Sequence, residues 1–173
     1  YCSANGELLY QVVRFAPKDF RQRRPDGNGG WSWKLDRVPR VLYRLPELIA
    51  ADPAQPVLIA EGEKDVDNLL RLGFVATCNA GGANKWPVEL NRHFKGASVY
   101  ILPDNDDAGR SHADKVAAAL HGIADGVRIV ELAGPQDWSV QDVAAALSAL
   151  LGKPVQAVSA PVEGAKAGLM QAG

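Results

Sequence analysis

Four short strand-like runs within residues 57–132 constrain the fold of this chain more than any other feature. They occupy residues 57–60, 74–78, 99–102 and 127–132. The first of them, residues 57–60, is a continuous apolar run of the kind found in a buried strand of a parallel sheet. Amphipathic segments at 63–72, 109–120 and 140–151 follow the first, third and fourth runs. This alternation predicts an α/β domain in which helices cover both faces of a mostly parallel sheet.

A different pattern precedes this domain. Residues 7–15 and 31–35 have the composition of short strands, and between them 21–30 is rich in Pro, Gly, Asp and Arg. We expect a long β-hairpin with a charged tip, followed by a short helix after Pro46. Turn-forming residues at 52–56 then predict a boundary. The expected organisation is a small, β-rich, basic subdomain at 1–52, the α/β domain at 53–152, and a flexible tail or linker at 153–173.

Charge is distributed unevenly along the chain, although the net charge is only −1. Residues 1–50 carry nine Lys or Arg against five Asp or Glu, whereas residues 51–151 carry eight against fourteen. An acidic centre beside a basic flank is typical of a metal site that handles a polyanion. The alternative interpretation is a solvated charged surface.

Some classes of protein are disfavoured by composition. No run approaches the roughly 18 apolar residues of a membrane helix, and the first residues lack the features of a signal peptide. We therefore expect a cytoplasmic protein that makes no contact with a membrane. Cys2 and Cys78 are too few and too far apart for a disulfide framework or a zinc cluster.

Carboxylates follow two of the predicted strands directly. Glu61 and Gly62 come after the run at 57–60, and Asp104 and Asp106 come after the run at 99–102. Ligands of open α/β sheets bind at the carboxyl ends of the strands. Side chains two residues apart in an extended segment point the same way. Oxygen ligands favour a hard cation, so these acids predict a Mg²⁺ site.

The same segments resemble a known family. Residues 61–65 (EGEKD) and 104–109 (DNDDAG) are similar to the two signature motifs of the Toprim family, the fold that primases and topoisomerases use for phosphodiester chemistry. Residues 79–86 (NAGGANKW) resemble the glycine-rich loop of primases from phages, plasmids and integrated elements. Residues 18–24 and 41–45 resemble the stretch that precedes Toprim in those mobile-element primases. The likeness covers roughly residues 5–150.

The resemblance implies roles for individual residues. Glu61 would be the general acid/base or a metal-organising carboxylate, and Asp104 and Asp106 would bind Mg²⁺, with Mn²⁺ as a possible substitute. Asp137 would hold a second metal, the alternative being a loop residue or helix cap. Lys64 would reach a phosphate from the first turn of its helix, the alternative being an exposed lysine.

Further residues are candidates for binding nucleotide or nucleic acid. Two glycines would let the backbone approach a nucleotide, the alternative being an ordinary loop. Several basic side chains would attract phosphates, the alternative being a charged surface. These candidates are Gly81, Gly82 and Lys85 for the nucleotide, and Arg21, Arg23, Arg24 and Lys34 for a template backbone.

The remaining acids and histidines are expected at the surface. Asp65 and Asp67 are predicted to face solvent from the helix at 63–72. His93, His112 and His121 show no metal-ligand spacing with one another and are predicted to be surface residues.

The resemblance implies the Toprim catalytic region of a DNA primase, which makes RNA primers from ribonucleoside triphosphates on single-stranded DNA. The sequence has neither a zinc motif nor a GxxxxGK[ST] loop, so a zinc-binding module and a helicase are expected in the same or a partner chain. The alternatives are a Toprim nuclease and a non-catalytic nucleic-acid-binding adapter. A topoisomerase is less favoured, because no accompanying cleavage domain presents a tyrosine.

Overall fold

The computed structural model describes residues 1–17, 19–82 and 85–131, together with a few isolated positions beyond them. The chain divides into two compact units, Tyr1–Leu132 and Ala133–Gly173. Most of the second unit lies outside the described residues, as do Asp137, most of the helix predicted at 140–151 and nearly all of the tail predicted at 153–173. The boundaries at 52 and 152 stay predictions.

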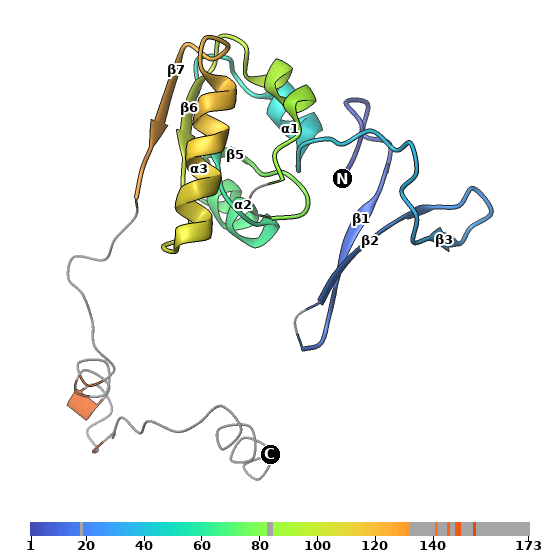
Figure 1. The fold of residues 1–173 in the computed structure, drawn as a ribbon, viewed down its shortest axis with the longest axis horizontal. Coiled ribbons are helices and arrows are strands. Elements are labelled where there is room, and N and C mark those ends of the chain that lie inside the picture. The colour runs from blue at the N-terminus through green and yellow to red at the C-terminus, as the bar shows by residue number, and fades with distance from the viewer. Residues whose placement is uncertain are drawn as a thin grey trace. The chain divides into compact units, whose positions relative to one another are not determined.

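A four-stranded parallel sheet forms the centre of this unit (Figure 1). Its strands are β4 (Val57–Ile59), β5 (Val75–Thr77), β6 (Ser98–Ile101) and β7 (Gly126–Ile129). The order across the sheet is β5-β4-β6-β7, and every neighbouring pair is parallel. All four predicted strands are present, and the α/β class is confirmed.

Two helices cover opposite faces of this sheet. α2 (Glu63–Arg71) leads from β4 outward to β5, and α3 (Asp107–Leu120) leads from β6 outward to β7 in the other direction. Because such crossovers are right-handed, opposite directions place the helices on opposite faces. The core agrees: Val66 of α2 packs with Ala76, whereas Val116 of α3 belongs to a separate apolar cluster. The helices predicted at 63–72 and 109–120 are therefore confirmed.

Two shorter helices complete the unit. α1 (Leu45–Ala50) begins with Pro46 in its first turn, where proline fits a helix, and it confirms the short helix expected there. A 3-10 helix, η1 (Val88–Phe94), joins β5 to β6 and buries Leu90 and Phe94 in the core. No helix in the described ranges combines the length and apolarity needed to span a membrane.

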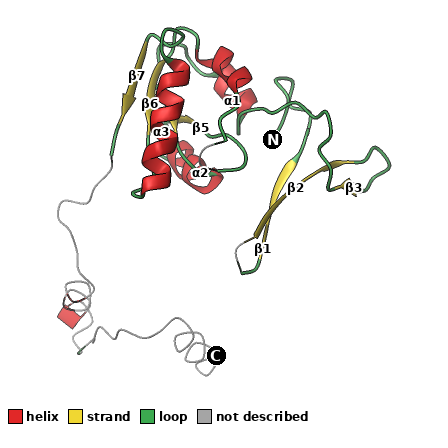
Figure 2. Cartoon of the chain, in the orientation of Figure 1, coloured by secondary structure: helices red, strands yellow, loops and turns green. Residues whose placement is uncertain are grey.

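The N-terminal segment forms a three-stranded antiparallel sheet (Figure 2). Its strands are β1 (Gln11–Phe15), β2 (Asp19–Pro25) and β3 (Trp31–Ser32), paired in that order. The β-rich subdomain is confirmed, but the single hairpin was wrong, because most of β2 lies in or beside the segment expected to be its tip. β2 lacks an apolar pattern; cross-strand pairs such as Val13 with Arg21 hold it instead.

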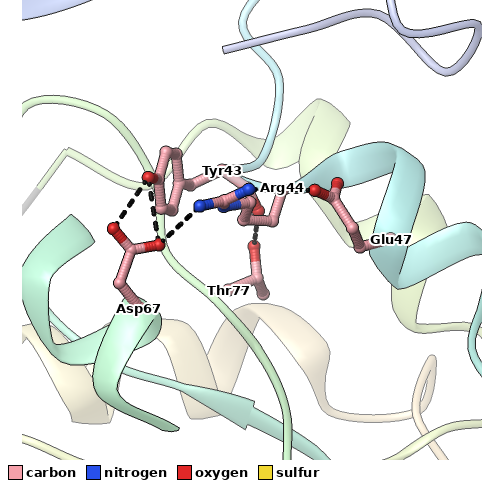
Figure 3. A network of polar contacts seen from close by, with 5 residues as sticks. All are labelled: Tyr43, Arg44, Glu47, Asp67 and Thr77. Atoms are coloured by element: carbon pink, nitrogen blue, oxygen red, sulfur yellow. Dashed lines mark hydrogen bonds and ion pairs between the residues drawn. The ribbon is translucent and has the colours of Figure 1, made fainter. Parts of the chain in front are cut away.

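A polar network attaches the segment after this sheet to the parallel sheet (Figure 3). Arg44 adopts a left-handed backbone conformation with φ of 56°, and its guanidinium binds Asp67 at 2.9 Å and Glu47 at 3.1 Å. The Tyr43 hydroxyl also donates to Asp67, at 3.2 Å, and the Thr77 hydroxyl donates to the Tyr43 carbonyl at 2.7 Å. Asp67 was expected to face solvent; it is instead half-buried, because α2 turns it toward this segment.

Candidate active site

The two central strands bring the predicted acids together. Ile59 of β4 and Ile101 of β6 are direct partners in the sheet, and Glu61 and Asp104 follow them at the carboxyl ends. From β4 the chain continues to β5 on one side of the sheet, and from β6 it continues to β7 on the other side. The carboxyl ends of β4 and β6 are therefore the topological switch point, where α/β sheets bind their ligands. The placement expected for Glu61 and Asp104 is the one observed.

Glu61 occupies an unusual electrostatic position. Its Oε1 atom is buried and has no hydrogen-bond partner among the described residues. Burial is the main cause that raises the pKa of Glu61 to about 7, and a hydrogen bond with Asp104 and the charges of Asp104, Asp106 and Asp65 raise it further. Carboxyl groups in such contact share a proton or a cation. A hard divalent cation fits this donor set, because it would neutralise the pair and give Oε1 a partner.

Asp106 lies beside this pair but is turned toward α3. Its carboxylate accepts a hydrogen bond from the Gly109 backbone nitrogen at 2.7 Å and caps the helix. The neighbouring Asp107 pairs with Arg110 at 2.7 Å. Within the described ranges no three Asp, Glu, His or Cys side chains are grouped closely enough to hold a metal ion. The predicted ligand set is therefore assembled only in part, with Glu61 and Asp104 in contact.

Gly109 holds the loop after β6 against α3. A Cβ atom at this position would lie 2.5 Å from the carbonyl oxygen of Asp104 and 2.9 Å from its backbone nitrogen. Only glycine allows the helix to pack this closely against the backbone of the loop. The spacing from Asp104 to Gly109 thus has a steric basis.

A cleft of about 990 Å³ opens at this edge of the sheet. Its described lining includes Tyr10, Val12, Phe20, Gln22 and Trp33 from the N-terminal segment. The charged residues of that lining are Asp36, Glu61, Glu63, Asp65, Asp104 and Asp106, against Arg40 and Lys85. With so many carboxylates, the cleft would repel a polyanion unless cations entered with it.

The glycine-rich loop forms another part of the cleft. Gly81 and Gly82 both have positive φ angles, of 97° and 72°, so this backbone favours glycine. Asn79 anchors the loop from within: its side-chain amide is 3.3 Å from the carbonyls of both Gly82 and Lys85, and it is only 2% exposed. Its Oδ1 atom lies 3.2 Å from Nε2 of His112.

His112 is therefore not the surface residue that was expected. It is 3% exposed and lies on the buried face of α3, between Gly109 and Val116. Burial is the main cause that lowers its pKa. His112 follows Gly109 by three residues and precedes Val116 by four, so all three share one face of the helix. This spacing could have predicted that His112 is buried. The sequence indicates the role of Asn79 more weakly, by a polar residue placed between a strand and a pair of glycines.

The other predicted binding residues lie apart from the acids. Lys64 is exposed on α2 and is absent from the described lining of the cleft. Arg24 pairs with Asp36 at 3.1 Å and donates to the Lys34 carbonyl at 3.1 Å. Arg21 and Arg23 lie on β2, where Arg21 pairs with Asp19 and Arg23 binds Gln11. The structure thus gathers these arginines in the antiparallel sheet.

Comparisons with known proteins find a partial sequence similarity to a DNA primase and a similarity of fold to a chain of a phage replication complex. No family model matches the chain. Over 77 residues it is 36% identical to DNA primase DnaG of Staphylothermus marinus, which is 42% of this chain and 18% of that protein. The chain thus spans less than a fifth of that relative. Its fold matches a chain of a bacteriophage T7 complex, in which a lagging-strand DNA polymerase interacts with primase domains of two gp4 subunits bound to an RNA/DNA hybrid and dTTP. The TM-score is 0.52 at 17% identity, over 88% of this chain and 69% of that one.

Proposed function

We propose that this chain is the Toprim catalytic region of a mobile-element DNA primase, acting in the cytoplasm. It would synthesise RNA primers on single-stranded DNA from ribonucleoside triphosphates, with Mg²⁺ as cofactor. The observation that supports this most is Glu61 at the switch point: its carboxyl group contacts Asp104, and its Oε1 atom is buried without a hydrogen-bond partner among the described residues. The sequence match to a DNA primase adds support. A zinc-binding module and a helicase, in the same or a partner chain, would complete the enzyme.

The residues of the cleft suit this chemistry. Glu61 and Asp104 would hold the metal ion, which when bound would neutralise triphosphate charge and activate the primer hydroxyl. Glu61, with a pKa of about 7, is able to hold or release a proton near neutral pH. Asp106 caps α3 and thereby fixes the loop that carries Asp104. Lys85 offers a positive charge to a phosphate at the glycine-rich loop.

Primer synthesis by the full-length protein tests the proposal. With labelled ribonucleotides, a single-stranded template and Mg²⁺ or Mn²⁺, we expect template-dependent oligoribonucleotides. Glu61→Gln should lower the rate by about a thousandfold, because it removes a general acid/base and a metal ligand. Asp114→Asn, at an exposed position of α3, is the matched control and should leave synthesis unchanged. Absence of product from the wild type, or full activity of Glu61→Gln, would refute the proposal.

Three further measurements separate the alternatives. Cleavage of single-stranded or nicked DNA in the same buffer without ribonucleotides would identify a nuclease that uses the same carboxylates. An adapter would show neither activity, and its DNA affinity would survive Asp104→Asn and Asp106→Asn. Thermal unfolding with Mn²⁺ adds a direct readout: a bound ion stabilises the wild type by about 2.7 kcal/mol at a hundredfold excess over Kd, and Asp104→Asn should lose this gain.

A further inference from the structure

Exposed aromatic side chains gather on the antiparallel sheet. Among the described Phe and Trp residues, all the exposed ones except Phe74 lie there, namely Phe15, Phe20, Trp31 and Trp33. Half of the Trp33 surface is exposed, at 51%. Such a concentration of exposed aromatic surface is unusual in a small sheet and marks a binding site more often than a packing defect.

Two arginines of β2 lie beside three of these rings. The guanidinium of Arg23 lies 3.9 Å from the centre of the Trp31 ring and 5.9 Å from that of Trp33. Arg21 lies over Phe15 at 5.2 Å, and the rings of Phe15 and Trp33 are 5.9 Å apart. We call these five residues the aromatic–arginine face. Cation–π contacts hold the arginines beside the rings.

The charge of the sheet favours an anionic occupant. Residues 11–34 contain six Lys or Arg and two Asp. Arg21 has a side chain that is 65% exposed, and its only acidic partner in the described structure is Asp19, whose side chain is 50% exposed. A surface pair of this kind contributes little and exchanges readily for a phosphate.

The face is continuous with the acidic cleft through Trp33. This ring packs against Phe15 on the face and also lines the cleft that contains Glu61 and Asp104. Phe20, which is 53% exposed with Arg14 over its ring at 5.9 Å, lines the cleft as well. Trp33 therefore belongs both to the face and to the lining of the cleft, so an extended ligand could run from the face into the cleft across this ring.

We infer that the aromatic–arginine face binds single-stranded nucleic acid by stacking its bases on Phe15, Trp31 and Trp33. The inference rests on the proposed function, since it supplies the strand to the cleft. Every base has a flat face, so stacking on these rings holds a strand without selecting its sequence. Arg21 and Arg23 neutralise its phosphates. The basic charge of this segment alone would attract the phosphates of a strand but would not bind its bases.

Oligonucleotide binding in EDTA tests this inference separately from catalysis. We would measure the anisotropy of a fluorescein-labelled thymidine oligonucleotide, and of an abasic oligonucleotide of the same length, with the full chain. Stacking predicts that the wild type binds the thymidine strand about tenfold more tightly. Trp33→Ala should remove this preference, and Trp33→Phe should restore much of it. Phe74→Ala, an exposed aromatic residue outside the sheet, is the matched control and should bind like the wild type.

Salt dependence separates the rings from the arginines. Trp33→Ala should leave the slope of affinity against salt unchanged, whereas Arg21→Gln should reduce it by about 0.7, because one phosphate is no longer neutralised. Equal wild-type affinity for the thymidine and abasic strands would overturn the inference. So would unchanged affinity for the thymidine strand in Trp33→Ala. The two proposals fail separately, because binding in EDTA involves no catalysis. Primer synthesis by Glu61→Gln would refute the proposed function and leave the stacking result standing.

Discussion

The acidic edge of the parallel sheet and the aromatic–arginine face are built by different means. At the acidic edge the backbone sets the geometry: two strand ends meet, Asp106 caps a helix, and Gly109 packs against the Asp104 backbone. On the face, side chains pair across a short sheet whose own core is small, as Arg23 does with Trp31. The difference predicts where each region is fragile. The acidic edge should fail when the backbone is disturbed, whereas on the face each side-chain pair should break independently of the others.

Gly109→Ala tests the backbone-built region and should have the largest effect. The added Cβ would lie within 3 Å of both the carbonyl oxygen and the nitrogen of Asp104, so the loop and α3 must separate. We expect the free energy of unfolding to fall by about 3 kcal/mol, measured by urea denaturation. Stabilisation by Mn²⁺ should fall with it, because the loop carries Asp104.

Gly126→Ala provides the matched control for this comparison. Gly126 begins β7, and a Cβ there would meet no atom within 4 Å. We expect a change of at most about 0.5 kcal/mol. If the two alanine variants were equally stable, close packing at Gly109 would not be what holds the acidic edge together.

Asn79→Ala sharpens the comparison, because it disturbs the glycine-rich loop through a side chain rather than the backbone. The substitution removes the amide group that binds the Gly82 and Lys85 carbonyls, together with its contact with the His112 ring. We expect a loss of about 2 kcal/mol in the free energy of unfolding and faster amide exchange at Gly82. Asn68→Ala, an exposed asparagine on α2, should cost far less. Unchanged exchange at Gly82 would contradict an anchoring role for Asn79.

The two regions also differ in how far the sequence predicts them. The positions of Glu61 and Asp104 followed from the order of strands and acids, because parallel strands present their carboxyl ends at one edge. β2 was missed because its charged side chains are held by cross-strand pairs, which no apolar pattern reveals. The sequence could not predict that the Asp106 side chain turns toward α3 either, because a carboxylate before a helix is suited both to capping and to metal binding.

The pairing of His112 with Asn79 shows the same limit within the core. The spacing along α3 indicates that position 112 is buried, but the partner lies 33 residues earlier and is brought close only by the sheet. Sequence patterns therefore locate groups that the backbone positions, and they miss groups whose environment depends on contacts between distant side chains.

Arg23→Ala tests the face built from side chains and should have the smallest effect on stability. The substitution removes the guanidinium from the Trp31 ring and breaks the hydrogen bonds to Gln11, at 3.1 and 3.0 Å. We expect a decrease of about 1 kcal/mol in the free energy of unfolding, because cation–π and cross-strand pairs at a surface contribute on this scale. Arg37→Ala, at an exposed position after β3, is the control and should change stability by less than about 0.5 kcal/mol. Fluorescence of the two neighbouring tryptophans should respond in the first variant only. A decrease as large as that of Gly109→Ala would mean that the face is a cooperative part of the fold, and the contrast between the two regions would fail.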